Sequence, residues 1–410
     1  VALQSSGRNK VIALIACCIV NLCLGSIYSW SVFSQAMTGY FNETYGLALH
    51  PGDLAIVYTI ANCVGPITMI AGGRINDLFG PRSVIMAGGI MFGGAMFASG
   101  FAKSVAFLCV TYGIIGGLGL GMAYGSVIST AIRLFPEKRG LMGGITTAAY
   151  GISSVLMPPI VSSIVSATSA PYAFKVTGIS FLLIIVVASW FLGKIGKPAS
   201  VPTGPVRDSH DKNWKDMLKM PVFYLMLLLL ICGAFSGMMV ISQASPIAVS
   251  MMGLSAANAA ITVSVLALFN TMGRIAAGGL SDRIGRIGTL RLACFCSAIS
   301  ELCLLLSERY GLLLFYIGIS VAGLSFGAFM GVYPGFTADR FGLRNNSVNY
   351  GIMCIGFAFA GYLGPRLAKS AYDSTGSYRN AFIYACVFSI CGIILTFVYN
   401  FVIRRGNKKC

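Results

Sequence analysis

Twelve apolar runs follow one another along the chain, separated by short breaks that carry most of the charged residues. Each run has about the 20 residues that an α-helix needs to cross a bilayer. A membrane β-strand needs only roughly 9 to 11. The pattern therefore predicts an all-α integral membrane protein with twelve transmembrane helices. Their expected cores are residues 11–36, 54–72, 83–102, 105–132, 141–165, 173–193, 220–250, 256–278, 289–307, 311–337, 347–368 and 380–403.

Composition agrees with a membrane protein. Hydrophobic residues make up 56% of the 410 residues and charged residues only 10%, whereas a typical soluble domain has about 25% charged residues. This difference excludes a soluble multidomain protein and a disordered chain. The net charge of +17 could indicate nucleic-acid binding, but Lys and Arg also collect in the cytoplasmic loops of membrane proteins.

The distribution of basic residues predicts the orientation. If both termini are cytoplasmic, 22 of the 29 Lys and Arg residues fall in inside segments and 6 in outside segments. The positive-inside rule therefore predicts a multi-pass protein of the inner or plasma membrane with both termini in the cytoplasm. We expect the lipid bilayer as a partner, no nucleic acid, and a monomer.

The longest polar stretch divides the chain into halves. Residues 194–219 are rich in Pro, Gly and Ser and then carry mixed charges, and the segment WKDMLK within them could lie on the membrane surface as a short amphipathic helix. The expected organisation is an N-terminal six-helix bundle (1–193), a cytoplasmic linker (194–219) and a C-terminal six-helix bundle (220–410).

The two halves repeat each other. GGRINDLFGPR (Gly72–Arg82) follows the second span and GGLSDRIGR (Gly278–Arg286) follows the eighth, so that Asp77 and Asp282 lie 205 residues apart, half of the chain. Two parallel six-span repeats predict two pseudo-symmetric bundles, as in secondary transporters.

The repeated loops have a chemistry suited to gating. An Asp at a helix end can accept hydrogen bonds from the backbone amides that start a neighbouring helix, or from a nearby cation. We therefore expect Asp77, Arg82, Asp282 and Arg286 to form latches that stabilise an outward-open state. The alternative is that they are charged loop ends without a switching role.

When the 22 inside and 6 outside basic residues are counted, Arg274 is the one that belongs to neither group and remains within a predicted span. It lies eight residues before Asp282, and so roughly 12 Å into the membrane. An intramembrane Arg costs at least about 2.5 kcal/mol and needs a partner. Glu301 is the only acid in a span core. Arg274 therefore either binds an anionic ligand, which we favour, or forms a structural pair with Glu301 or with backbone carbonyls.

Polar side chains in other spans complete a candidate binding cavity. A Tyr hydroxyl can donate a hydrogen bond to a carboxylate while its ring covers apolar carbons. Each Tyr alone could equally serve in packing or as an interfacial anchor. The candidates are Tyr28, Tyr124, Tyr150 and Tyr333, with Gln243 as a weaker one.

Proton coupling and enzymatic chemistry are the remaining questions. Neither of the two His residues lies where a buried proton relay is expected, whereas Glu301 could titrate or be fixed in a salt bridge. The sequence has no CxxC pair, phosphate-binding loop or nucleophile constellation. We therefore expect no enzyme, no catalytic residue, no metal and no cofactor.

Several motifs together resemble the oxalate:formate antiporter family of the major facilitator superfamily, which is close to the monocarboxylate transporters. Besides the two loop motifs, they are YSW (Tyr28–Trp30), RLFPEKRG (Arg133–Gly140), AAYG (Ala148–Gly151), the GR of the eighth span and NYG (Asn349–Gly351). The resemblance covers essentially all twelve spans and implies the major facilitator fold. It also implies a central cavity in which Arg274, Tyr28, Tyr124 and Tyr150 contact a small carboxylate.

Two departures from these relatives bear on the substrate. The oxalate transporters have a second cation, a Lys, where this chain has Phe357, and the animal monocarboxylate transporters have an Asp, to which proton coupling is assigned, where this chain has Asn270. One central cation favours a monocarboxylate such as lactate, pyruvate or formate over oxalate. Asn270 argues against proton coupling through that position. Anion exchange, or proton coupling through a different side chain, remains open.

The expected function is secondary active transport of small carboxylates by alternating access, through proton symport or anion exchange. An oxalate:formate-type antiporter, a drug or cation exporter on the same fold, and a receptor that binds an anion without transporting it are the alternatives.

Overall fold

The computed structural model describes residues 7–50, 53–192 and 211–407, apart from a few side chains. Within these ranges the chain is almost entirely helical and contains no strand. Twelve helices are long and apolar enough to cross a membrane. The predicted all-α class and the twelve predicted spans are thereby confirmed.

The first six spans occupy the N-terminal half, and two of them are interrupted. The first span consists of α1, a 3₁₀ turn and α2, and the fourth consists of α5, a π-helical stretch and α6. The helices are α1 (Gly7–Leu24), the 3₁₀ turn Gly25–Ser29, α2 (Trp30–Tyr45), α3 (Ala55–Phe79), α4 (Pro81–Ser99), α5 (Val105–Leu108), the π stretch Cys109–Gly116, α6 (Gly117–Leu134), α7 (Arg139–Ala167) and α8 (Ala170–Leu192).

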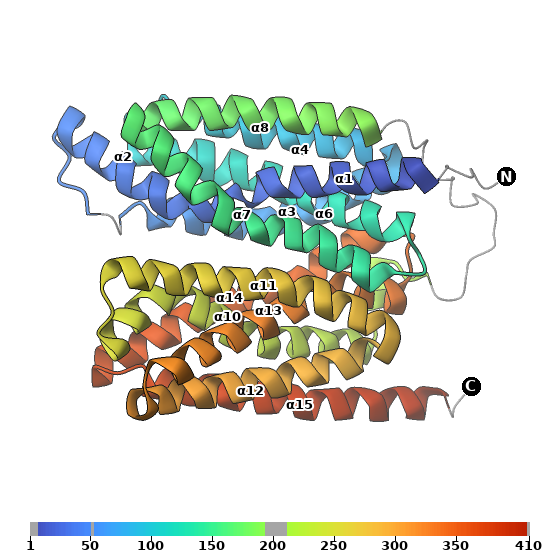
Figure 1. The fold of residues 1–410 in the computed structure, drawn as a ribbon. Coiled ribbons are helices and arrows are strands. Elements are labelled where there is room, and N and C mark those ends of the chain that lie inside the picture. The colour runs from blue at the N-terminus through green and yellow to red at the C-terminus, as the bar shows by residue number, and fades with distance from the viewer. Residues whose placement is uncertain (1–6, 51–52, 193–210, 408–410) are drawn as a thin grey trace. The chain divides into compact units, whose positions relative to one another are not determined.

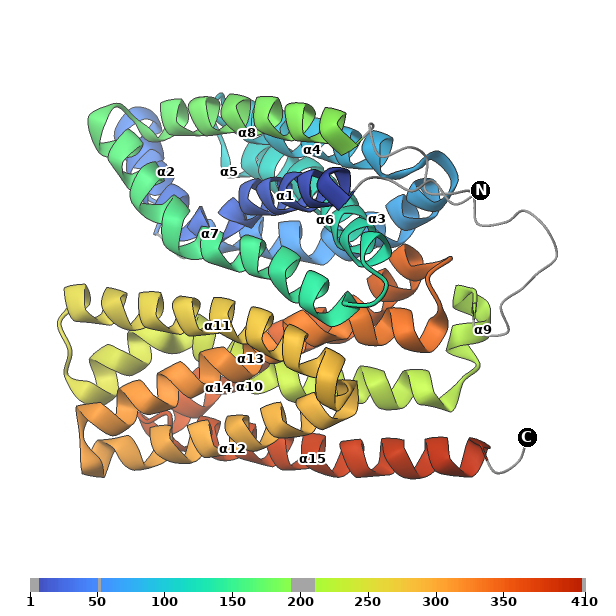
Figure 2. The ribbon, with the colours of Figure 1, turned by 45° about the vertical axis from the view of Figure 1, so that its right-hand side comes forward.

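The C-terminal half begins with a short helix and continues with six spans. The predicted amphipathic segment WKDMLK forms α9, which lies next to the start of α10 (Figure 2). The helices are α9 (Trp214–Leu218), α10 (Pro221–Met252), α11 (Ala256–Ile284), α12 (Arg286–Tyr310), α13 (Leu312–Phe341), α14 (Asn346–Thr375) and α15 (Arg379–Asn407).

The repeated loop motifs have the same backbone conformation. Gly80 between α3 and α4 has φ +87° and ψ +164°, and Gly285 between α11 and α12 has φ +84° and ψ +157°. Only glycine adopts such a conformation easily. The matching glycines of the two halves therefore make the same sharp turn, as the internal repeat predicts.

The chain divides into two compact units, each of which includes a segment from the other sequence half. Unit 1 comprises Val1–Pro136, Ala149–Asn213 and Ala338–Ile352. Unit 2 comprises Glu137–Ala148, Trp214–Thr337 and Met353–Cys410. The first turns of α7 thus belong to unit 2, and the start of α14 belongs to unit 1.

Helices in each unit pack closely. In unit 1, α4 and α8 run side by side, and in unit 2, α12 and α15 do so (Figure 1). A Cβ on Gly88 of α4 would lie 2.7 Å from the carbonyl oxygen of Gly119 of α6. Small residues are the means by which membrane helices bring their backbones together. Stacked rings fill the cores, with Phe33 on Phe174 in unit 1 and Phe235 on Phe388 in unit 2.

Candidate functional site

Arg274 lies on α11 in the interior of unit 2. Its side chain is only 2% exposed. The guanidinium Nε donates a hydrogen bond of 3.1 Å to Oδ1 of Asn270, one helical turn earlier, and Nη1 donates one of 2.7 Å to the carbonyl oxygen of Thr147 on α7. Nη2 donates to no described residue.

Glycines fix the backbone around this arginine. A Cβ on Gly144 of α7 or on Gly331 of α13 would collide with the carbonyl oxygen of Arg274, and a Cβ on Gly327 would collide with that of Asn270. Helix α11 is therefore held between α7 and α13 by backbone-to-backbone contact. The guanidinium starts from a rigid position, as a binding group should.

The charge of Arg274 is not compensated by any acid that the structure describes. No described carboxylate lies within 4.0 Å of the guanidinium, and the carboxyl oxygens of Glu301 receive no hydrogen bond. The considered pair with Glu301 is therefore absent, whereas the considered contact with a backbone carbonyl is present. Neutral acceptors orient a cation but leave its charge in place.

Three tyrosines from spans one, four and five meet in unit 1. The ring centroids of Tyr28 and Tyr150 are 5.3 Å apart at an interplanar angle of 71°, and those of Tyr124 and Tyr150 are 4.9 Å apart at 58°. Tyr150 is buried, whereas Tyr28 and Tyr124 are half-buried. We call these three residues the tyrosine cluster. The family resemblance named the same three residues.

The interruption of the first span supports this cluster. Tyr28 lies in the 3₁₀ turn Gly25–Ser29. A Cβ on Gly25 would collide with the carbonyl oxygen of Tyr150. Glycine therefore allows the first span to approach α7 at the point where Tyr28 meets Tyr150.

Tyr333 and Gln243, the other two predicted binding residues, are engaged within unit 2. The Tyr333 hydroxyl donates a 2.8 Å hydrogen bond to the carbonyl oxygen of Met226, and its ring is 1% exposed. Tyr333 thus uses its only donor to join α13 to α10, and we leave it out of the proposed site. Gln243 accepts a 3.1 Å hydrogen bond from the Tyr378 hydroxyl at its Oε1, which leaves its amide nitrogen without a described partner.

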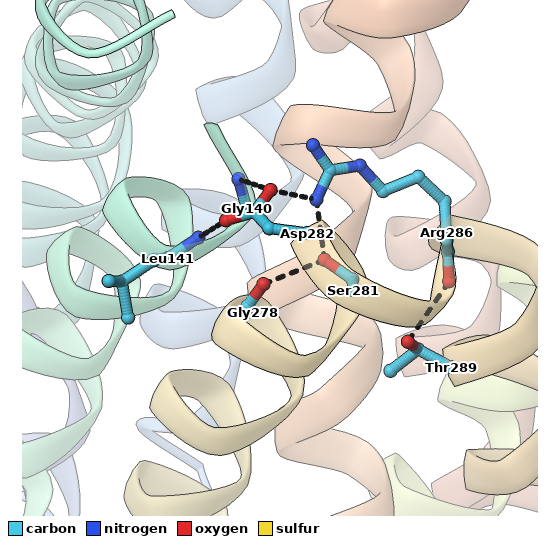
Figure 3. A network of polar contacts seen from close by, with 8 residues as sticks. Gly140, Leu141, Gly278, Ser281, Asp282, Arg286 and Thr289 are labelled. Atoms are coloured by element: carbon cyan, nitrogen blue, oxygen red, sulfur yellow. Dashed lines mark hydrogen bonds and ion pairs between the residues drawn. The ribbon is translucent and has the colours of Figure 1, made fainter. Parts of the chain in front are cut away.

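Asp282 binds the start of α7 (Figure 3). Its two carboxylate oxygens accept hydrogen bonds from the backbone amides of Gly140 and Leu141, both at 2.9 Å, and Oδ1 also accepts one of 2.7 Å from Arg286 Nη1. Arg286 also donates to the hydroxyl of Ser281. The carboxylate therefore contacts both the positive end of a helix and a neighbouring cation.

The first loop motif contributes different contacts, and the side chain of Asp77 lies outside the described residues. Arg82 is exposed. Asn76, which precedes Asp77, donates a 2.9 Å hydrogen bond from Nδ2 to the hydroxyl of Ser347 at the start of α14, and Gly73 lies against Ser347 and Val348. In unit 1, therefore, the end of α3 contacts the start of α14.

The loop before α14 is also held by α6 and by the end of the linker. Nη2 of Arg133 donates to the carbonyl oxygens of Leu343 and Arg344 at 2.9 and 3.1 Å. Asn345 and Asn349 donate from Nδ2 to the carbonyl oxygen of Lys212 at 3.3 and 3.0 Å. Asn349 is the Asn of the NYG motif, and its contact with the linker could not be recognised from the motif alone.

Comparison with known proteins shows the family. A sequence profile of the Major Facilitator Superfamily matches residues 15–365. The chain is 28% identical over 398 residues to the oxalate:formate antiporter of Oxalobacter formigenes, covering 97% of this chain and 91% of that protein. It is 24% identical over 423 residues to monocarboxylate transporter 12 of Rattus norvegicus, covering 93% and 82%.

Other relatives and solved structures agree. The uncharacterized MFS-type transporter YhjX of Escherichia coli strain K12 is 27% identical over 351 residues, 85% of each chain. The fold resembles that of the transporter FucP, whose structure was solved in the outward conformation, with a TM-score of 0.73, 13% identity and coverage of 96% of this chain and 99% of that one. The human organic anion transporter MFSD10 gives a TM-score of 0.71 at 13% identity, covering 96% and 100%. The chain therefore belongs to the Major Facilitator Superfamily.

Proposed function

We propose that this protein is a secondary transporter of small monocarboxylates, such as lactate, pyruvate or formate, that works by alternating access through proton symport or anion exchange. The observation that carries the proposal is Arg274, a buried cation whose described acceptors are a neutral amide and a neutral carbonyl. An uncompensated charge in such a place is costly. A carboxylate ligand would compensate it.

The geometry of the guanidinium suits this ligand. Asn270 and Thr147 occupy Nε and one proton of Nη1, while Nη2 has no described acceptor and is assigned to a ligand oxygen. The planar fork of an Arg binds both oxygens of a carboxylate at once, which a Lys cannot do. Asn270 thus orients the fork from within the same helix.

Charge matching favours a monoanion. The position where oxalate transporters have a second cation is Phe357, whose ring lies against Phe326 with centroids 6.2 Å apart. With Arg274 alone, a monoanion brings the local charge to zero and a dianion leaves it at −1. The second charge of a dianion would have to be desolvated without a partner.

The tyrosine cluster of unit 1, taken by itself, also has the chemistry of a carboxylate-binding group. Phenolic hydroxyls can donate to a carboxylate oxygen while the rings cover the carbon skeleton. The relatives named above as an oxalate:formate antiporter and a monocarboxylate transporter support a carboxylate as the substrate class. Oxalate:formate exchange is the second candidate. An exporter of cations is disfavoured by the charge of Arg274.

Uptake into proteoliposomes tests the proposal. Purified protein is assayed with labelled lactate, pyruvate, formate and oxalate, with and without unlabelled anion inside and with and without a pH gradient. Arg274→Gln should reduce transport at least about 30-fold, since truncating one partner of a buried charge pair costs about 2 kcal/mol or more. Arg274→Lys should bind more weakly but retain some transport.

Arg291→Gln is the matched control. Arg291 is also an arginine of unit 2, and it donates from Nε to the Thr396 hydroxyl at 3.0 Å and lies over the ring of Phe397. Its loss should leave substrate affinity unchanged. Full transport by Arg274→Gln would refute the role of Arg274, and preference of the wild-type protein for oxalate would refute the monocarboxylate assignment.

A further inference from the structure

Glu301 on α12 is the most deeply buried acid in the part of the chain that the structure describes. Its side chain is 1% exposed, and neither carboxyl oxygen receives a hydrogen bond from a described group. It forms no described ion pair. The substrate site and the loop contacts make no use of this residue.

A charged carboxylate in this position would be expensive. Moving an ion of this size out of water costs several kcal/mol even after relaxation, and the cost is offset only by good partners. Glu301 has no such partner. Acids within membrane spans are rare and commonly mark ion or proton pathways.

A cluster of three buried hydroxyls lies one helical turn from Glu301. Ser297, four residues earlier on α12, lies 2.7 Å from the hydroxyl of Ser236 on α10 and accepts a 2.9 Å hydrogen bond from the hydroxyl of Ser389 on α15. All three serines are buried. Residues four apart share one face of a helix, so that this serine cluster and Glu301 lie along the same face of α12.

The other titratable groups nearby are thiols. Cys386 on α15 lies close enough to Glu301 to interact with its charge. Beside the serine cluster, Cys294 of α12 and Cys232 of α10 both lie next to Gly392 of α15. From α13 the nearest described polar contact is the carbonyl oxygen of Gly318, which accepts a hydrogen bond from Ser300. No described basic side chain neutralises Glu301.

We propose that Glu301 is a proton-binding site that couples transport to the proton gradient, with Ser236, Ser297 and Ser389 as the proton path. This inference rests on the proposed function. A proton from water adds to one oxygen of the Glu301 carboxylate to give a neutral acid, and the same bond breaks when the proton returns to water. One proton that moves with one monoanion moves no net charge.

The burial of Glu301 couples its protonation to the packing of the surrounding helices. The ionised form requires water or a hydroxyl donor, whereas the neutral form tolerates the closed interface between α10, α12 and α15. Protonation therefore favours the closed interface, and release of the proton favours an open one. A serine hydroxyl both donates and accepts a hydrogen bond, so that the cluster can pass a proton or hold the water that does so.

Glu301→Gln tests the coupling because Gln resembles the neutral acid permanently. In proteoliposomes with the membrane potential clamped, the variant should retain exchange of the labelled monocarboxylate that wild-type protein exchanges fastest. It should lose accumulation driven by an inward pH gradient at least about tenfold, within the usual range of coupling between sites. Ser297→Ala should slow the gradient-driven uptake and spare exchange.

Two matched variants control for position and polarity. Glu308→Gln alters an exposed acid near the end of the same helix, and Ser300→Ala alters a buried serine beside Glu301 that lies outside the serine cluster. Both should retain gradient-driven uptake. If Glu301→Gln keeps full gradient-driven accumulation, or if a sodium gradient drives uptake instead, the inference is wrong.

An infrared measurement separates this inference from the proposed function. The carboxyl-stretch spectrum of wild-type protein, compared with that of Glu301→Gln at several pH values, reports a protonated acid without any substrate. If the spectrum shows no protonated carboxyl signal that disappears in Glu301→Gln, the inference is wrong. If Glu301→Gln fails to fold, Glu301→Asp takes its place, and the signal should then shift in that variant. If wild-type protein exchanges no carboxylate, the proposed function fails while the infrared result still decides whether Glu301 binds a proton.

Discussion

Substitution of Asp282 by Asn should release the start of α7. The Asp282 carboxylate accepts two backbone hydrogen bonds, from Gly140 and Leu141, and an ion-paired one from Arg286. The side-chain oxygen of Asn can accept one of the two backbone hydrogen bonds. The side-chain NH2 group would then face the second backbone N–H, and two donors cannot form a hydrogen bond with each other. The substitution removes one charge-assisted hydrogen bond and the negative charge at the positive end of the helix.

The magnitude follows from these losses. A hydrogen bond to a charged group contributes about 1.5 to 3 kcal/mol, and a charge at a helix N-terminus contributes about 0.3 to 1 kcal/mol. The latched state should therefore lose about 2 to 4 kcal/mol, which at 1.4 kcal/mol per factor of ten is a shift of roughly 30- to 700-fold. The ion pair with Arg286 adds little, because partly exposed pairs contribute at most about 1 kcal/mol.

Hydrogen–deuterium exchange of the peptide that contains Gly140 and Leu141 measures this loss directly. Its amides should exchange faster in Asp282→Asn by the same factor, since protection reports local opening. Transport kinetics should change in turnover more than in substrate affinity, because we propose that this contact acts as a gate and takes no part in substrate binding. Arg283→Gln is the control, since Arg283 is exposed in the same loop and makes no hydrogen bond or ion pair with a described residue. Unchanged exchange at Gly140 and Leu141 in Asp282→Asn would refute the latch.

Two further predictions concern the substrate charge and the packing of α11. Phe357→Lys should make oxalate a stronger competitor relative to a monocarboxylate, because the second cation compensates the second charge of oxalate. If both anions compete with labelled substrate as they do in the wild-type protein, the charge argument is wrong. Gly331→Ala should lower thermal stability by about 1 to 3 kcal/mol through overpacking against the Arg274 carbonyl. Thermal unfolding in detergent measures this loss, with Gly279→Ala as control, because there the nearest atom to the added Cβ is Leu141 Cδ1 at 3.4 Å; equal stability of the two variants would contradict it.

The membrane spans could be predicted from the sequence because apolar length is a local property. The breaks within spans could not. The 3₁₀ turn Gly25–Ser29 lies where Gly25 approaches the backbone of Tyr150, more than 120 residues later in the chain. Nothing in the apolar run around residues 11–36 distinguishes this position from an ordinary helical one.

The candidate site was predictable to different degrees. Arg274 is visible as a lone charge in an apolar run, and Asn270 lies one turn before it. The contact with Thr147 is different, because every residue has a carbonyl oxygen and only the packing of α7 on α11 selects this one. The apolar residues around Glu301 in the sequence indicate that it is buried. They do not show whether a basic side chain lies near enough to pair with it.

The loop contacts explain why the two units do not coincide with the two sequence halves. The segment Glu137–Ala148 belongs to unit 2, and within it Gly140 and Leu141 bind Asp282, while Thr147 binds Arg274. The segment Ala338–Ile352 belongs to unit 1, where Asn76, Arg133 and the linker end at Lys212 hold it.

Each exchanged segment is thus retained by a few polar contacts, most of them to backbone groups. Contacts of this kind can be broken and re-formed without unfolding a helix, because water can replace each partner at a small net cost. Arg274 is the exception, since its contact with Thr147 is buried and cannot be replaced so easily by water. If the start of α7 leaves unit 2 during the transport cycle, Arg274 loses one of its two described acceptors and its need for an anion increases. On the proposal that Arg274 binds the substrate, a motion that breaks the Asp282 contact with α7 would also strengthen that binding, because both contacts are made to the first turns of the same helix.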